Sequence, residues 1–371
     1  MAQTFTSEAA ASAGFLSPLH EMTQTMPTCL WNDSAALEEL QYSILNGAVG
    51  ATCNPVIVLD VLRQEMHIWR ERILDLIRKM PLATEDEIAW ALVEEISATR
   101  ATLLGGIFQA HKGRNGRLSV QTDPRFYRNP EAIVTQAVRF DSLAPNMIVK
   151  IPATKAGILA MEEVTYRGIS VNSTVCFTLP QCIATAEAIE RGLRRRESEG
   201  LDISRIGSVC TIMVGRLDDW LKVYADKHDV TTDPGNLEWA GIAVFKKTYR
   251  IYRDRGYRLR LLSAAFRNHM HWSELAGGDV VISPPYKWQK RFNASGIKVL
   301  NRIDESVNPA IVDELRAKFP DFVAAWTEGG LSHDEFDTYP PTVRTLRQFI
   351  AACHELDEHI RELMLPNPDK A

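Results

Sequence analysis

The chain has 371 residues, of which 45% are hydrophobic and 24% are charged, a composition that supports a large folded core and excludes an extensively disordered protein. Its 42 basic and 47 acidic side chains give a formal net charge of −5, which argues against a general nucleic-acid-binding protein. No apolar run approaches the length of a membrane span, so we expect neither nucleic acid nor a membrane as a partner.

The N-terminal segment, residues 1–26, is rich in Ser, Thr and Ala and contains no Lys or Arg. A secretory signal needs a positively charged start and a mitochondrial transit peptide needs arginines, so neither fits this segment. We therefore expect a disordered tail on a cytoplasmic protein. The six cysteines form no C-x-x-C pair and are scattered along the chain, which is typical of reduced core residues.

From residue 29 onward, short apolar runs alternate with helix-patterned segments, the pattern of repeated βα units around a parallel sheet. Eight such runs predict a closed (β/α)8 TIM barrel in a single domain at 27–371, with the barrel core at about 29–296. The predicted strands cover residues 29–32, 49–53, 118–122, 147–151, 169–177, 206–214, 259–266 and 279–283.

Helical segments interrupt and extend this repeat. Residues 58–111, after the second strand, have apolar positions at helical spacing and predict an insertion of one or two helices outside the barrel. After Gly296 the chain turns to helices at 309–318 and 341–365, within a C-terminal helical region at 297–371. Phe349, Cys353, Leu356 and Ile360 recur at helical spacing, so we expect the last helix to pack on the barrel exterior.

A charged residue lies inside the fourth predicted strand. The run Met147 to Ile151 is apolar except for Lys150 and ends at Pro152, the pattern of a strand buried on both faces. Burial removes the hydration of an ammonium, which lowers its pKa and increases the fraction of nucleophilic amine, the form that attacks a carbonyl to give a Schiff base. A lysine at a strand end could instead extend its head group to water.

Other polar residues lie at the predicted strand ends, where the catalytic groups of such barrels gather. Each has a structural alternative: Asp33 could cap the following helix, Asn54 before Pro55 could be a turn residue, and Thr174 could be a bonded core hydroxyl. Their convergence around Lys150 is what favours a site. The residues in strand order are Asp33, Asn54, Asp123, Lys150, Asn172 with Thr174, Thr211 and Arg267.

Six segments in these positions resemble the transaldolase family, in the family's order over most of the barrel. The two that contain Lys150 and Asn172 are specific together, whereas Val-Gly-Arg alone would be weak. They are residues 52–55 (TCNP), 120–125 (VQTDPR), 148–154 (IVKIPAT), 168–177 (GISVNSTVCF), 214–216 (VGR) and 266–268 (FRN).

The resemblance implies catalytic roles for four residues. Lys150 would form a Schiff base with a ketose carbonyl, and its positive nitrogen would accept electrons as the neighbouring C–C bond breaks. Asp33 would be the base that removes the sugar hydroxyl proton. Asp123 and Thr174 would hold the water that moves protons during imine formation.

The resemblance also implies residues that bind the substrate. Asn54 and Asn172 would bind the dihydroxyacetone part, and Thr211 stands where the family commonly has a serine, which keeps a hydroxyl. Arg216 and Arg267 would hold the phosphate, which guanidinium groups suit; without the resemblance, Arg216 would be read as a residue on a helix surface.

Two departures from the family pattern bear on this reading. Asp123 stands where a glutamate is usual, a carboxylate one methylene shorter, and catalysis that depends on close geometry is sensitive to such a retraction. Ala265 stands where the family often has a serine facing the phosphate, which removes one hydroxyl.

The sequence thus predicts a transferase of the pentose phosphate pathway that moves a dihydroxyacetone unit from sedoheptulose 7-phosphate or fructose 6-phosphate to an aldose phosphate. Alternatives are an aldolase that releases dihydroxyacetone to water and a non-catalytic sugar-phosphate-binding barrel. No metal or organic cofactor is implied, because the lysine itself would be the electron sink. The His269, His271 and Glu274 cluster lacks a defined third ligand and does not predict a metal site. The partners considered are sugar-phosphate substrates and a second copy of the chain in a homo-oligomer.

Overall fold

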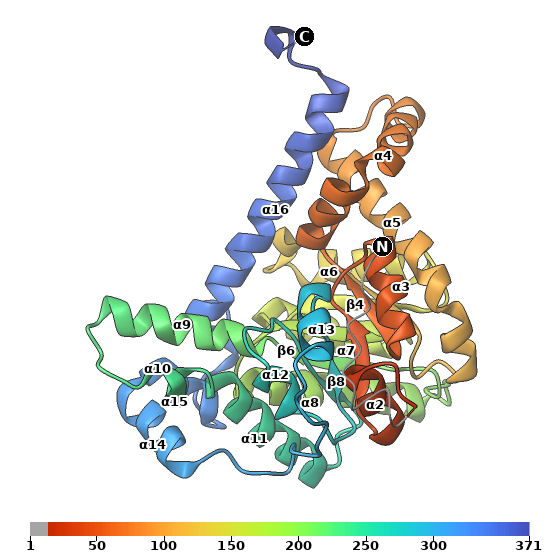
Figure 1. Cartoon of the computed structure of the whole chain (residues 1–371). Coiled ribbons are helices and arrows are strands. Elements are labelled where there is room, and N and C mark those ends of the chain that lie inside the picture. The colour runs from red at the N-terminus through yellow and green to blue at the C-terminus, as the bar shows by residue number, and fades with distance from the viewer. Residues whose placement is uncertain (1–13, 371) are drawn as a thin grey trace.

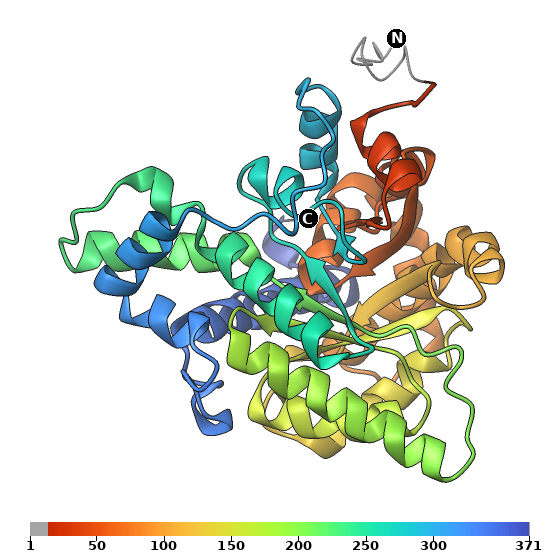
Figure 2. The ribbon, with the colours of Figure 1, turned by 90° about the horizontal axis from the view of Figure 1, so that it is seen from below.

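The computed structural model describes residues 14–370. Eight parallel strands pair in chain order and β8 pairs with β1, so the sheet closes into a barrel (Figure 1, Figure 2). This confirms the predicted (β/α)8 TIM barrel. The strands are β1 (Cys29–Asn32), β2 (Ala48–Cys53), β3 (Arg117–Gln121), β4 (Met147–Pro152), β5 (Val171–Cys176), β6 (Val209–Ile212), β7 (Arg260–Ser263) and β8 (Val281–Ile282).

Every residue of β3 to β8 is buried, because helices cover the outside of the sheet and side chains fill its inside. A polar residue in these strands therefore lies in a core or in the barrel interior. The predicted strands at 169–177, 206–214 and 259–266 are longer than the observed ones. For example, Val214 already opens helix α9, so apolar character continues across the strand-to-helix turn.

The helices alternate with the strands, as the predicted βα repeat requires. In chain order the α-helices are α2 (Pro18–Thr25), α3 (Leu37–Leu45), α4 (Pro55–Lys79), α5 (Glu85–Ala110), α6 (Pro130–Asp141), α7 (Lys155–Tyr166), α8 (Leu179–Ser198), α9 (Val214–Lys227), α10 (Pro234–Leu237), α11 (Ala240–Arg255), α12 (Met270–Ser273), α13 (Tyr286–Asn293), α14 (Pro309–Lys318), α15 (Pro320–Trp326) and α16 (Pro340–Met364). The 3₁₀ turns are η1 (Pro124–Phe126), η2 (His333–Glu335) and η3 (Pro368–Lys370).

The predicted insertion after the second strand consists of two long helices, α4 and α5. Helix α4 begins at Pro55, whose missing N–H costs nothing at the first helical position, and Asn54 caps it. Helix α5 begins with a capping box in which Thr84 and Glu87 bond each other's backbone N–H groups. Figure 1 shows both helices projecting beyond the barrel beside α16, with which they are in contact.

The prediction of a disordered tail over residues 1–26 is wrong for residues 18–25, which form helix α2; residues 1–13 of that expected tail lie outside the described residues. Ser17 caps α2 by accepting from the His20 N–H at 3.1 Å. Leu19 and Met22 are fully buried and hold the helix against the barrel. Polar composition hid this short amphipathic segment, whose order comes from tertiary packing.

The last helix, α16, lies closer to the strand ends than the expected position on the barrel exterior. Thr342 in its first turn accepts a hydrogen bond from the Gln181 side-chain amide at 3.4 Å. Further along, α16 packs against α4 and α5. The helical spacing nonetheless identifies its buried face, since Phe349, Cys353, Leu356 and Ile360 are all buried. Among residues 14–370, no helix combines the length and the apolar character needed to cross a membrane.

Candidate active site

The floor of the barrel interior is apolar. A cluster separate from the main core joins a side chain of β4 to side chains of β1, β6, β7 and β8. None of these four strands pairs with β4, so the side chains can meet only inside the barrel. Its buried members are Trp31, Ile148, Val209, Leu262, Ala264 and Val281. Since side chains alternate along a strand, residues two positions further toward the strand ends, such as Lys150 after Ile148, also face inward.

Lys150 is therefore an interior lysine of β4, and only 4% of it is exposed. Burial lowers the pKa of its ammonium, the nearby Asp33 carboxylate raises it, and the Arg216 guanidinium lowers it further. The alternative in which the head group reaches bulk water does not fit this burial. A lysine in this setting has the access to neutral amine that a nucleophile needs.

Asp33 follows β1 on the same side of the strand as Trp31. It does not cap the next helix, because the N-cap of α3 is Ala36. Burial raises the pKa of the Asp33 carboxyl, and the positive charges of Lys150 and Arg216 lower it. The structure thus brings Asp33, Lys150 and Arg216 within electrostatic influence of one another.

Asn172 on β5 is paired in register with Lys150 and is held by hydrogen bonds on both sides. Its Nδ2 donates to Ser119 Oγ on β3 at 2.9 Å, and its Oδ1 accepts from Thr211 Oγ1 on β6 at 2.6 Å. The first bond passes from β3 to β5 over the face of β4, which places both side chains inside the barrel. Thr211 therefore orients the amide beside Lys150.

Asn54 and Thr174 lie at the ends of β2 and β5. Asn54 caps α4, because its Oδ1 accepts from the Ile57 N–H at 3.0 Å. The side-chain N–H groups of Asn54 are left for another partner. Thr174 is fully buried on the inward face of β5. The next residue, Val175, has a left-handed φ of 52°, which is costly for a β-branched side chain and marks an irregular strand end.

Asp123 is not brought to Lys150. Strand β3 ends at Gln121, and Asp123 begins the 3₁₀ turn η1, accepting from the Arg125 N–H at 2.8 Å. Its carboxylate also forms an ion pair with the Arg125 guanidinium, at 2.6 Å. It lines a cavity of about 450 Å³ between α5 and α6, outside the barrel. The expected placement of the Asp123 carboxylate beside the lysine is thus corrected.

Gln121 occupies the position expected for that carboxylate. It pairs in register with Lys150 and is 1% exposed, and its Oε1 has no hydrogen-bond partner within residues 14–370. This residue was not predicted from the sequence. The signal was present, because Leu118 and Val120 belong to the outer core and strand alternation then points Ser119 and Gln121 inward.

The two arginines lie together at the ends of β6 and β7. Burial lowers the pKa of Arg216 to about 10, and the charges of Arg267 and Arg344 contribute in the same direction. Arg216 donates to Gln348 Oε1 at 2.6 Å, and Arg267 pairs with Asp219 at 2.8 Å. Arg216 borders a cavity of about 240 Å³, which is also lined by Asp219, Pro341, Arg344, Thr345 and Gln348. Its excess of guanidinium groups suits an anion.

The candidate metal group of His269, His271 and Glu274 is dispersed among other partners. Glu274 pairs with Lys246 and Arg302, and His271 bonds Asp218. These three side chains do not converge on one point.

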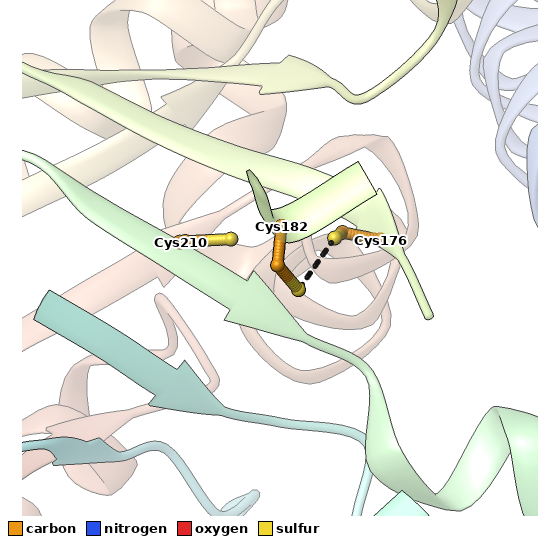
Figure 3. Close-up of side chains that lie close together, drawn as sticks. All are labelled: Cys176, Cys182 and Cys210. Carbon is orange, nitrogen blue, oxygen red and sulfur yellow. Dashed lines mark hydrogen bonds between the residues drawn. The ribbon is translucent and has the colours of Figure 1, made fainter. Parts of the chain in front are cut away.

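Within residues 14–370, one group of side chains could supply three ligands to a metal ion. It consists of Cys176, Cys182 and Cys210, whose sulfurs lie within 4.8 Å of one another (Figure 3). All three are buried, and burial raises the pKa of Cys176 and Cys182, which favours neutral thiols over metal-binding thiolates. Hydrogen bonds from the Cys176 and Cys182 thiols lower the pKa of Cys210, and Cys176 Sγ lies 3.4 Å from Cys182 Sγ. We read the group as core packing.

The fold and the polar group at the carboxyl ends of its strands define a (β/α)8-barrel protein with the site geometry of a barrel enzyme. The family model described as Transaldolase/Fructose-6-phosphate aldolase matches residues 30–337. The chain belongs to this family.

Curated relatives agree with this assignment. The chain is 33% identical over 206 residues to Transaldolase 2 of Streptomyces avermitilis, covering 55% of each chain. It is 32% identical over 219 residues to Transaldolase 1 of Streptomyces coelicolor, covering 57% of this chain and 56% of the relative. It is 28% identical over 246 residues to a transaldolase of Mycobacterium leprae, covering 63% and 65%. The chain therefore spans little more than half the length of the first two relatives.

Proposed function

We propose that the protein is a transaldolase that transfers a dihydroxyacetone unit from a ketose phosphate to an aldose phosphate through a Schiff base on Lys150. The observation that carries the proposal is the burial of Lys150 inside the barrel, next to Asp33, Asn172 and Gln121. Family membership supports the same reaction class. We also propose sedoheptulose 7-phosphate and fructose 6-phosphate as donors, and a place in the cytoplasmic pentose phosphate pathway.

The proposed reaction uses each group in turn. The neutral Lys150 amine adds to the ketose carbonyl, and loss of water gives the iminium. Asp33 takes the proton of the hydroxyl next to the breaking C–C bond, and the bonding electrons move to the iminium nitrogen while the aldose phosphate leaves. The enamine then attacks the carbonyl of the acceptor, and water releases the product from Lys150. Asn54 and Asn172 would hold the dihydroxyacetone hydroxyls, and Thr174 would hold the water.

The phosphate would lie at the arginine cavity. Arg216 and Arg267 are assigned to it by resemblance, and Arg344 of α16 lines the same space as Arg216. The influence of Arg267 and Arg344 on Arg216 is repulsive, so an anion between them would remove an unfavourable interaction. This supports a phosphorylated rather than a neutral sugar.

Reductive trapping tests the nucleophile. Borohydride with fructose 6-phosphate should add one covalent adduct to the parent protein, seen by mass spectrometry, and Lys150→Met should abolish both adduct and turnover. Lys246→Met is the matched control, because Lys246 is also buried but donates to Glu274 at 3.0 Å. An adduct that persists in Lys150→Met would refute the assignment. No adduct in the parent would favour the non-catalytic sugar-phosphate-binding barrel.

Release of dihydroxyacetone to water is the second candidate, and Gln121 favours it. An amide cannot take or give a proton as a carboxylate does, so the inward position beside Lys150 handles water differently from the glutamate that is usual in transaldolases. Product analysis with fructose 6-phosphate separates the two functions. For a transferase we expect turnover to depend on added aldose phosphate, with little free dihydroxyacetone in its absence. Steady release without acceptor would instead establish the aldolase.

A further inference from the structure

We infer that the buried pair His271 and Asp218 positions the turn that carries Arg267 against Arg216. Neither residue of the pair belongs to the segments that resemble transaldolases. The inference rests on the proposed function, since it takes Arg216 and Arg267 as the phosphate-binding groups. In this arrangement His271, as a neutral imidazole with one fixed tautomer, sets the affinity for phosphate without contacting the substrate.

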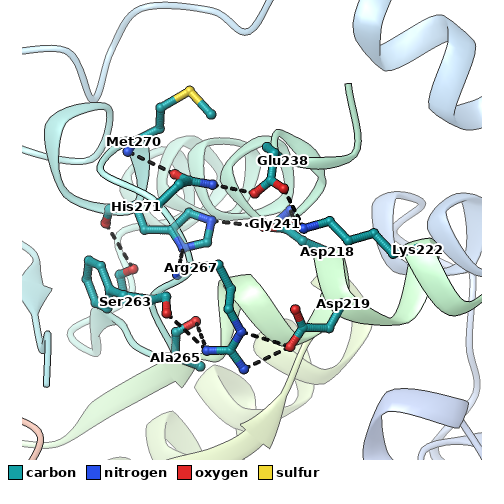
Figure 4. Close-up of polar contacts among 12 residues, drawn as sticks. Asp218, Asp219, Lys222, Glu238, Gly241, Ser263, Ala265, Arg267, Met270 and His271 are labelled. Atoms are coloured by element: carbon teal, nitrogen blue, oxygen red, sulfur yellow. Dashed lines mark hydrogen bonds and ion pairs between the residues drawn. The ribbon is translucent and has the colours of Figure 1, made fainter. Parts of the chain in front are cut away.

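The contacts of His271 fix its protonation state (Figure 4). The Arg267 backbone N–H donates to His271 Nδ1 at 3.1 Å, and His271 Nε2 lies 2.9 Å from Asp218 Oδ2. A backbone N–H can only donate, so Nδ1 must be the bare acceptor and the ring proton must lie on Nε2, donating to the carboxylate. The pair is thus a neutral imidazole and an ionised Asp218.

Asp218 is held on its other oxygen as well. Its Oδ1 accepts from the Gly241 N–H of α11 at 2.8 Å, and the side chains of Asp218 and His271 are both fully buried. Burial raises the pKa of the Asp218 carboxyl, and the hydrogen bond from His271 lowers it. With donors at both oxygens, the carboxylate can remain charged in the core and can dictate the tautomer of the ring.

The same ring lies against the segment that carries Arg216. Gly215 packs so closely on the turn after β7 that a Cβ at this position would lie 2.2 Å from Ala265 O, 2.6 Å from Arg267 Cγ and 3.1 Å from His271 Cε1. Ala265 itself has a left-handed φ of 65°. A strained turn persists only where its surroundings hold it, and here His271 supplies that hold.

The head group of Arg267 is directed by separate contacts. Its Nε donates to Asp219 Oδ2 at 2.9 Å, and its Nη1 donates to the carbonyl oxygens of Ala265 at 3.2 Å and Phe266 at 3.0 Å. His271 therefore fixes the backbone of Arg267, whereas Asp219 and the turn fix its guanidinium. Loss of the first contact should displace the guanidinium relative to Arg216 while leaving Lys150 in place.

Asp218→Asn tests the pair at constant size. The side-chain oxygen of the variant can still accept from the Gly241 N–H, but its new amide group donates toward Nε2 of His271, which forces the ring proton onto Nδ1, facing the Arg267 N–H. We expect the fructose 6-phosphate concentration that half-saturates reductive trapping to rise about tenfold, the effect of losing roughly one hydrogen bond. Half-saturation by dihydroxyacetone, which has no phosphate, and the maximal trapping rate should not change.

His269→Gln is the matched control, because His269 lies on the same turn but bonds Ser273 through Nδ1. It should leave both half-saturation values unchanged. Equal losses for fructose 6-phosphate and dihydroxyacetone in Asp218→Asn would overturn the inference, since they would mean general damage. If Asp218→Asn does not fold, His271→Gln takes its place with the same expectations. The glutamine amide reaches toward Asp218, so the Arg267 N–H loses its acceptor.

Titration with inorganic phosphate separates this inference from the proposed reaction. Calorimetry of the parent and of Asp218→Asn should show affinity for inorganic phosphate weakened about tenfold in the variant, which again corresponds to the loss of one hydrogen bond. This readout needs no turnover, so it stands even if the parent forms no covalent adduct. Equal phosphate affinities in parent and variant would overturn the role of the pair while leaving the Schiff-base proposal intact.

Discussion

At the scale of single residues, two opposite charges act on the pKa of Lys150, in addition to the lowering by burial. Asp33 stabilises its ammonium and so raises its pKa, whereas Arg216 repels the ammonium and lowers the pKa. Replacing Arg216 by a neutral side chain should therefore raise the pKa of Lys150. Replacing Asp33 should lower it. The neutral amine is the reacting form, so the pH at which imine formation becomes half-maximal should move with the pKa.

This predicts opposite shifts for two variants. In Arg216→Gln, the pH midpoint of trapping by cyanoborohydride should move to higher pH than in the parent, and in Asp33→Asn it should move to lower pH. Dihydroxyacetone is the suitable ketone, because it has no phosphate for Arg216 to bind. Rates measured across the pH range in parent and variants give the midpoints. Shifts in the same direction would show that these charges do not control Lys150.

Residue positions were predictable where strand periodicity applies and failed where the strand ends. The interior placement of Lys150 and Asn172 follows from buried strands, and both were predicted from the sequence. Asp123 was assigned by likeness of residue type, but β3 stops two residues earlier and the Arg125 contacts turn the carboxylate outward. Gln121 was overlooked because a side-chain amide is neither an acid, a base nor a nucleophile. The alternation of side chains along β3 nevertheless places it beside Lys150.

At the scale of elements, the hydrophobic pattern predicted which helices and strands exist better than it predicted where they pack. All eight strands and the two insertion helices coincide with predicted segments, because their apolar periodicity extends over several residues. Helix α2 was missed because three buried residues, Pro18, Leu19 and Met22, and a serine cap suffice to order it. The location of α16 was missed for another reason: spacing identifies the buried face of a helix but not the surface that covers it.

Contacts between distant segments explain the position of α16. The Gln181 side-chain amide donates to the carbonyl oxygens of Ala153 at 3.0 Å and Val175 at 3.1 Å, besides its bond to Thr342. It also accepts from the Phe177 N–H at 3.1 Å. One buried side chain thus satisfies the irregular end of β5 next to Thr174 and joins it to α16. Such a junction depends on residues 161 positions apart, which local sequence patterns do not relate.

At the scale of the whole molecule, the insertion is tied to the segment that follows Asp33. Glu65 lies within α4 but has a non-helical backbone conformation. Its carboxylate accepts hydrogen bonds from the Leu37 N–H at 2.5 Å and from Trp69 Nε1 at 3.0 Å. It also forms a buried ion pair with Arg100 of α5, whose Nε donates to the Ala35 carbonyl at 2.8 Å. The insertion therefore supports the loop between β1 and α3 that begins at Asp33.

Removal of the Glu65 carboxylate should accordingly affect both stability and catalysis. Glu65→Leu leaves the Arg100 guanidinium buried without its anion, which typically costs about 3–5 kcal/mol of unfolding free energy. Denaturant unfolding should register this loss, and turnover should fall further than trapping of dihydroxyacetone, because the Asp33 loop rather than Lys150 is loosened. Glu71→Leu on the same helix removes a carboxylate whose side chain is 73% exposed and should change stability by less than about 1 kcal/mol. Similar stabilities for the two variants would mean that the insertion does not brace the site, whereas partial recovery in the Glu65→Leu/Arg100→Leu double variant would identify the unpaired charge as the cause.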